Sequence, residues 1–117
     1  MATTTSGISP VGNNNYQTSV TTNSDGSLST TTYRVDKTGA NPVAVSTVNT
    51  TADGKSTRTM SAGATDAEKQ AFNDPNSPER QAYSQQVQSL NPYGSNPTAQ
   101  QTAVLNSAAG KTNNATT

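Results

Sequence analysis

The sequence predicts a mainly β fold with short C-terminal helices, in which a four-stranded antiparallel meander lies between extended N- and C-terminal arms. Three observations support this class. Runs rich in Thr, Val and Tyr, which suit pleated strands, alternate with short turn signals in the first half of the chain. Two Asp-Gly dipeptides and one Lys-Thr-Gly segment separate these runs, as is typical of hairpins. After residue 64 the pattern changes to capped helical segments.

The segment 1–15 ends in a Gly-Asn-Asn-Asn run and has no periodicity, so we expect an arm that is flexible or bound to a partner. A β-meander built from two Asp-Gly hairpins is predicted over 16–64. Its four strands are expected at 16–23, 28–35, 42–51 and 56–62.

Turn lengths predict the register of these strands. Residues 25–26, Asp-Gly, are interpreted as a two-residue type I′ turn, which places Val20 opposite Thr31 and Tyr16 opposite Val35. Residues 37–39, Lys-Thr-Gly, are interpreted as a three-residue loop with a left-handed glycine. The remaining expected pairs are Tyr33 with Val43, Thr31 with Val45, and Thr47 with Met60.

These registers place the larger side chains on one apolar face, which we expect to form a protein interface. Tyr93 lies in a Pro- and Gly-rich turn and is also expected to make contacts. The candidate interface residues are Tyr16, Val20, Tyr33, Val35, Val43, Val45, Met60 and Tyr93.

An internal correspondence accompanies the hairpins, because a shift of 28 residues superposes 20–26 on 48–54. Either the hairpin is duplicated, or two Thr-rich hairpins with Asp-Gly turns resemble each other through composition. Both interpretations stay open.

Short helices joined by Pro, Asn and Gly turns are predicted over 65–110. A capping box opens the first helix at Thr65 with Glu68 at its third position. A second helix begins at Ser77 and Pro78, and a third runs from Thr98 to a closing glycine at residue 110. The segment 111–117 is expected to be a loose tail.

Composition predicts a thin core. Only 28% of the 117 residues are hydrophobic, whereas Thr, Ser, Asn and Gln make up 56 residues and the formal net charge is zero. Ordering a chain of this composition costs more free energy than such a core supplies alone, so a partner or self-association is expected to add burial.

The same composition argues against several function classes. The chain contains no His and no Cys, and local turns or helix starts account for its carboxylates, so we expect no enzyme activity and no catalytic, cofactor or metal site. Single, scattered basic residues do not form a nucleic-acid patch. There is also no apolar run of the roughly 20 residues that a membrane span requires.

We therefore expect a non-enzymatic structural or assembly protein that docks an apolar sheet face and extended arms on neighbouring subunits. The expected setting is a virion, with the chain as a minor capsid-, decoration- or tail-associated component. Its expected partners are other structural proteins, including copies of itself. The alternative is a secreted or cell-surface adhesive or fibre module. A third reading is a carboxylate-based hydrolase or a sugar-binding protein.

Overall fold

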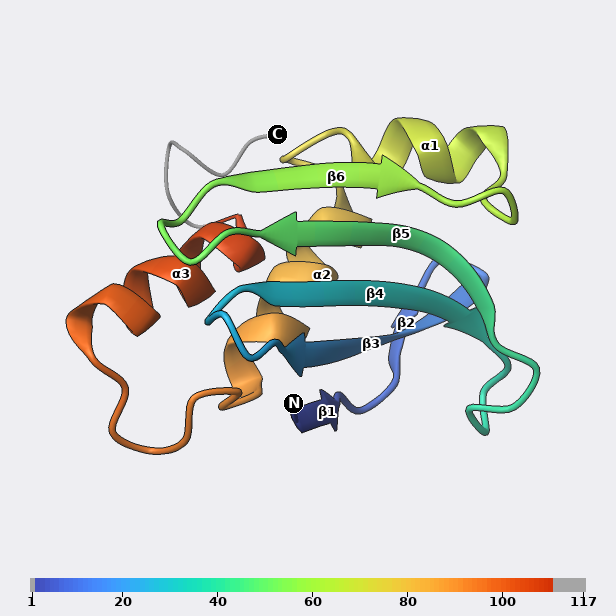
Figure 1. Cartoon of the computed structure of the whole chain (residues 1–117). Coiled ribbons are helices and arrows are strands. Elements are labelled where there is room, and N and C mark those ends of the chain that lie inside the picture. The colour runs from blue at the N-terminus through green and yellow to red at the C-terminus, as the bar shows by residue number, and fades with distance from the viewer. Residues whose placement is uncertain (1, 111–117) are drawn as a thin grey trace.

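Within residues 2–110, the part of the chain that the structure describes, six antiparallel strands form one sheet with three helices against one face (Figure 1). This computed structural model confirms the predicted class, mainly β with short C-terminal helices. The strands are β1 (Ala2–Thr5), β2 (Ser9–Val11), β3 (Asn14–Thr22), β4 (Leu28–Val35), β5 (Val43–Thr50) and β6 (Ser56–Met60). The helices are α1 (Asp66–Phe72), α2 (Pro78–Ser89) and α3 (Ala99–Ala109). The predicted tail 111–117 lies outside the described residues.

The N-terminal segment belongs to the sheet, so the expected arm over 1–15 and the expected count of four strands are corrected. β1 pairs with the second half of β3 and β2 with its first half. Ser6 joins the two short strands to β3, because its N–H donates to the Thr18 carbonyl (2.8 Å) and its Oγ accepts from the Thr18 N–H (3.0 Å). Pro10, which has no N–H to donate, lies in the edge strand β2, where a proline is tolerated.

The first Asp-Gly turn is longer than predicted. The Gly26 N–H donates to the Asn23 carbonyl (3.0 Å), and the Asn23 N–H donates to the Ser27 carbonyl (2.9 Å). These bonds enclose a three-residue loop in which Gly26 is left-handed (φ +88°). Asp25 stabilises this form, since its Oδ1 accepts from the Ser27 N–H (2.9 Å) and hydroxyl (2.6 Å).

This extra loop residue changes the register by one. Val20 pairs with Thr30, not Thr31, and Tyr16 pairs with Arg34, not Val35. Because adjacent residues of a strand point to opposite faces, a one-residue shift moves the whole set of side chains. Tyr33 consequently lies on the face opposite to Tyr16, and the single apolar face predicted from the turns is wrong.

The later pairings also differ from the predicted ones. The loop at 37–39 has the predicted three residues, with Gly39 left-handed (φ +90°), but Asn41 is left-handed too (φ +56°) and β5 is irregular opposite Thr32 and Tyr33. Residues 52–54 form a third three-residue loop, longer than the two-residue Asp-Gly turn expected there. The observed pairs are Tyr33 with Ala44, Thr31 with Thr47, and Thr47 with Thr59.

Helix caps agree with the sequence predictions. Thr65 and Glu68 form a reciprocal capping box at α1, and Ser77 caps α2 with Pro78 at its start. Thr98 caps α3 together with Gln101, and Gly110 ends this helix in a left-handed conformation (φ +80°). Short-range hydrogen bonds determine these ends, which explains why the local sequence predicts them.

The core lies between the sheet and the helices. Tyr16 of β3 packs edge-on against Phe72 of α1, with ring centroids 5.4 Å apart. The apolar face of the sheet is thus covered by helices of the same chain. The fully buried large side chains include Tyr16, Val20, Leu28, Val45, Phe72, Tyr83, Val87 and Val104.

Candidate interaction surface

The eight candidate interface residues do not form one surface. Tyr16, Val20, Val35 and Val45 are buried, with at most 6% of each residue exposed. Val43 is exposed, whereas Tyr33, Met60 and Tyr93 are half-buried. The core between the sheet and the helices includes Tyr16, Val20 and Val45, whereas Val35 is buried outside this cluster.

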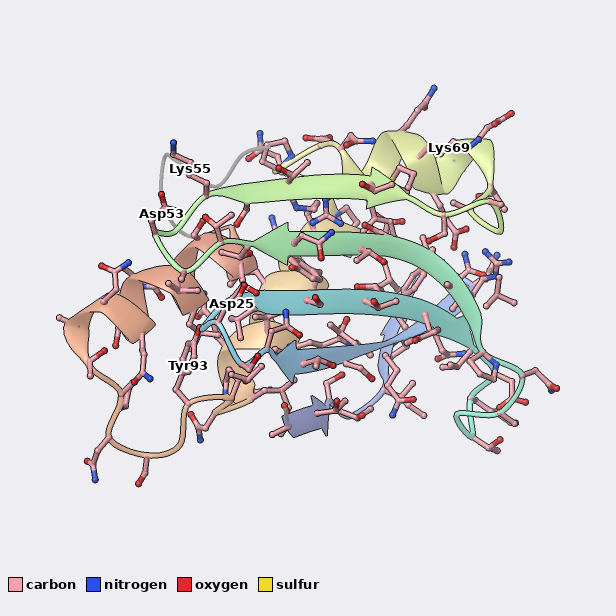
Figure 2. The ribbon with its side chains drawn as sticks, viewed as in Figure 1. Asp25, Asp53, Lys55, Lys69 and Tyr93 are labelled. Atoms are coloured by element: carbon pink, nitrogen blue, oxygen red, sulfur yellow. The ribbon has the colours of Figure 1, made fainter. Side chains whose placement is uncertain are left out.

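Tyr93 has an internal role. Its hydroxyl donates to the Gly26 carbonyl (2.8 Å) and fastens the loop after α2 to the first Asp-Gly turn. Figure 2 shows Tyr93 and Asp25 at the same end of the sheet, with Asp53 and Lys55 on the neighbouring turn. The contact explains the position of Tyr93 without an external partner.

The sheet face turned toward the viewer in Figure 1 carries no helix within the described chain. Ten of its side chains form two ranks that cross five strands, from β1 through β3, β4 and β5 to β6. We name these ten residues the polar face. The first rank is Thr3, Thr21, Ser29, Asn49 and Thr57, and the second is Thr5, Ser19, Thr31, Thr47 and Thr59.

The polar face is accessible and uncharged. Each of its ten residues is exposed or half-buried, whereas their neighbours on the central strands β3, β4 and β5 are largely buried against the helices. Nine of the ten carry a hydroxyl group, and Asn49 carries an amide. A hydroxyl can donate one hydrogen bond and accept two, so the surface offers donors and acceptors in close alternation.

Hydrogen bonds between side chains of neighbouring strands fix the positions of several residues of the polar face. Hydroxyls pair between Thr3 and Thr21 at 2.9 Å, and between Thr31 and Thr47 at 3.3 Å. A third pair joins Thr5 to Ser19 at 3.1 Å, and Ser29 donates to Asn49 at 3.3 Å. Such cross-strand pairs restrict rotamers, so the outward hydroxyls and methyl groups occupy defined positions before any partner binds.

The turn carboxylates are engaged locally. Asp36 accepts from the Thr38 N–H (2.8 Å), the Thr38 hydroxyl (2.6 Å) and the Ala40 N–H (3.0 Å). These bonds hold the pKa of the Asp36 carboxyl below its ordinary value, and the bonds from Ser27 do the same to the pKa of Asp25. Among residues 2–110, no group of three or more His, Cys, Asp or Glu residues is placed to hold a metal ion.

One buried polar cluster was not predicted from the sequence. Glu68 of α1 accepts from the Tyr16 hydroxyl (2.7 Å) and the Thr65 N–H (2.9 Å), and it forms an ion pair with Arg34 of β4. Burial acts to raise the pKa of Glu68, but these hydrogen bonds and the charge of Arg34 outweigh it, so the pKa is lowered. Sequence reasoning assigned Glu68 only to the capping box, because its other partners lie far away along the chain.

Comparisons with known proteins give no significant match to a family model, a curated protein or a solved structure. Across the described residues, none of the helices combines the length and the apolar character that a membrane crossing demands. The interpretation of function therefore depends on the molecule itself.

Proposed function

We propose that this chain is a non-enzymatic structural protein of a larger assembly and that it docks onto neighbouring subunits through the polar face. The observation that carries this proposal is the pair of ordered, uncharged ranks on the uncovered side of the sheet. This surface replaces the apolar face as the proposed interface, because the helices already cover the apolar side.

A second copy of the same chain is the occupant that fits the polar face. Hydroxyl groups donate and accept, so two copies related by a two-fold axis present complementary groups to each other. No formal charge lies among the ten residues, and therefore no like charges meet when the face contacts itself. The threonine methyl groups add apolar contact between the hydrogen-bonding positions.

A virion is the proposed setting, with the chain as a capsid-, decoration- or tail-associated component. The small size, the absence of Cys and the Thr- and Asn-rich composition support this choice. Mass spectrometry of purified particles tests it. Peptides of this chain at a constant ratio to the major shell protein support a virion component, and their confinement to a soluble or envelope fraction contradicts it.

Self-docking is tested by sedimentation velocity across a wide concentration range. Thr31 lies at the centre of the second rank, on the middle strand β4, so Thr31→Lys places a charge at the middle of the proposed contact. We expect the wild-type chain to self-associate and Thr31→Lys to remain monomeric while keeping its circular dichroism spectrum.

Gln85→Lys is the matched control, because Gln85 is exposed on α2, on the helical side of the molecule. This variant should associate like the wild-type chain. A wild-type chain that stays monomeric throughout, or equal effects of the two lysine substitutions, would show that the polar face is not the contact.

A secreted or cell-surface fibre module is the second candidate, and the correspondence of the two hairpins favours it. Thr22 pairs with Leu28 and Thr50 with Ser56, so both loops close at positions 28 residues apart. Their closing hydrogen bonds also match within 0.1 Å. Repeated hairpins can extend into longer sheets. Electron microscopy of concentrated protein tests this candidate, because filaments support a fibre module and closed oligomers do not.

A further inference from the structure

Two arginine side chains from different elements meet at a small cavity between the sheet and the helices. Arg58 extends from β6, and Arg80 lies in the first turn of α2. The cavity has a volume of about 10 Å³, and Ser56, Ser107 and Gly110 also line it. This volume is close to the minimum that one water-sized particle occupies.

Aromatic rings and one hydroxyl hold Arg58 in place. Its guanidinium carbon lies 4.8 Å from the ring centroid of Tyr83 and 5.8 Å from that of Phe72, and its Nη1 donates to Ser46 Oγ (2.5 Å). Burial, together with the charge of Arg80, lowers the pKa of Arg58 to about 10, and Tyr83 opposes both effects. The group therefore still carries its positive charge at neutral pH.

Arg80 approaches the same cavity from the helix side. Its Nη1 donates to the Phe72 carbonyl (3.1 Å). Gly110 leaves space for the other amino group, because a Cβ at this position would lie only 3.1 Å from Nη2. Burial also lowers the pKa of Arg80, while Tyr83 and Asp74 act to raise it.

The two guanidinium groups have few protein acceptors in this region. A guanidinium has five N–H donors. The bonds to Ser46 and Phe72 use one donor of each group, and Tyr83 is a further side-chain hydrogen-bond partner of Arg58. Among residues 2–110, the ion pair within 4.0 Å is that of Arg34 with Glu68, so no described carboxylate pairs with Arg58 or Arg80. Both arginines are half-buried, and even partial burial of positive charge without a counter-charge is costly.

Neighbouring groups compensate only part of this charge. The aromatic rings attract the guanidinium of Arg58, and the C-terminal end of α3 favours nearby cations. However, the Ala108 carbonyl in this last turn already accepts from the Tyr83 hydroxyl (2.5 Å). Ser107 donates its hydroxyl hydrogen to the Gly54 carbonyl (2.7 Å) and shares a bond with Ser56 (2.8 Å). Among the lining residues within 2–110, the arginines are therefore the donors available to a particle in the cavity.

We propose that this cavity binds one small monovalent anion, about the size of chloride, between the guanidinium groups of Arg58 and Arg80. The anion reduces the repulsion between the two arginines and accepts hydrogen bonds from donors that the described chain leaves unused. The cavity holds about one water-sized particle and is partly open to solvent, so the proposed occupant is a single monatomic ion. The site links β6 to α2 and α3, and it is independent of docking through the polar face.

Thermal unfolding in sodium chloride and in sodium gluconate at equal ionic strength tests the proposal. The unfolding midpoint of the wild-type chain should rise with chloride and then saturate, because one site fills. Arg80→Gln should lose this difference between the two salts. Lys69→Gln removes an exposed charge from α1, which contributes no residue to the cavity lining, and this variant should retain the difference. Figure 2 shows Lys69 at the opposite end of the sheet from Lys55.

Equal midpoints of the wild-type chain in the two salts overturn the proposal, as does an unchanged chloride response in Arg80→Gln. Crystals of the wild-type chain grown in bromide give a second readout that needs no variant. An anomalous peak between the two guanidinium groups, together with saturable stabilisation in solution, supports the site. A peak without such stabilisation marks an adventitious ion only and overturns it.

Discussion

At the scale of single residues, the Glu68 side chain has three separate tasks. It caps its own helix through the Thr65 N–H, accepts from Tyr16 of β3 and pairs with Arg34 of β4. Its carboxylate is thus the polar connection between α1 and the two central strands. A buried charge of this kind depends on all its partners, since each one replaces water that burial removed.

Replacing this carboxylate tests its contribution to stability. Glu68→Gln keeps an acceptor for Thr65 but leaves Arg34, which is about a quarter exposed, without its counter-charge. We expect the free energy of unfolding in urea to fall by about 2 kcal/mol. Asp66→Asn is the control, because Asp66 is exposed in the first turn of the same helix and should change stability much less.

The same residue predicts a pH dependence. The pKa of Glu68 is lowered from its ordinary value of 4.5 in the folded chain, so its ionised form stabilises the fold above that value. This stability is lost as pH falls below 4.5 and through the folded-state pKa. The difference in unfolding free energy between wild type and Glu68→Gln should therefore be largest near neutral pH and shrink toward pH 3; an unchanged difference contradicts the assignment.

At the scale of elements, the two three-residue Asp-Gly turns set much of the sheet register, and the sequence did not distinguish them from two-residue turns. Both loop types use Asp-Gly. The polar strands also give little help, because Thr and Ser occupy both faces, including the buried Thr18, Thr30 and Thr32. Helix ends were predictable because their capping partners are three residues apart, as at Thr65.

Glycine substitutions test the turn geometry. Gly26→Ala places a side chain at a left-handed position (φ +88°) and should lower the free energy of unfolding by about 1 to 2 kcal/mol. Gly54→Ala should cost a similar amount, because its turn is equivalent (φ +95°). Gly7→Ala has no atom within 4 Å of the added Cβ and no positive φ, so it should change stability by less than about 0.5 kcal/mol. Thermal unfolding of all three variants under the same conditions measures these differences.

At the scale of the whole molecule, the helices and the sheet share one core. Val87 of α2 is fully buried and belongs to the same cluster as Val20 of β3 and Val104 of α3. Low hydrophobic content led to the expectation of a partner over the apolar face. Composition alone did not show that three short helices would fold back over it, because this arrangement depends on contacts between distant segments.

A shared core predicts cooperative unfolding of the isolated chain. Val87→Ala should lower the free energy of unfolding by about 2 kcal/mol and shift the circular dichroism and tyrosine fluorescence transitions together. Gln85→Ala, on the exposed side of α2, should leave both transitions near their wild-type positions. Separate transitions in the Val87→Ala chain would mean that the sheet is stable without the helices.

The N-terminal strands also show the limit of sequence reasoning at this scale. β1 and β2 are four and three residues long, and neither has the alternation that marks a half-buried strand. They pair with β3 because this neighbouring strand offers backbone partners, and no pattern in their own residues indicates the pairing. The polar face extends onto β1 for this reason, through Thr3 and Thr5.

Because the polar face is uncharged, association through it should depend little on the pH and salt concentration of the medium. None of its ten side chains titrates in the physiological range, and none attracts a counterion. Association through this surface should therefore be nearly constant between mildly acidic and mildly basic media and between dilute buffer and seawater-like salinity. A contact of this kind suits a particle that is put together in one environment and must persist in another.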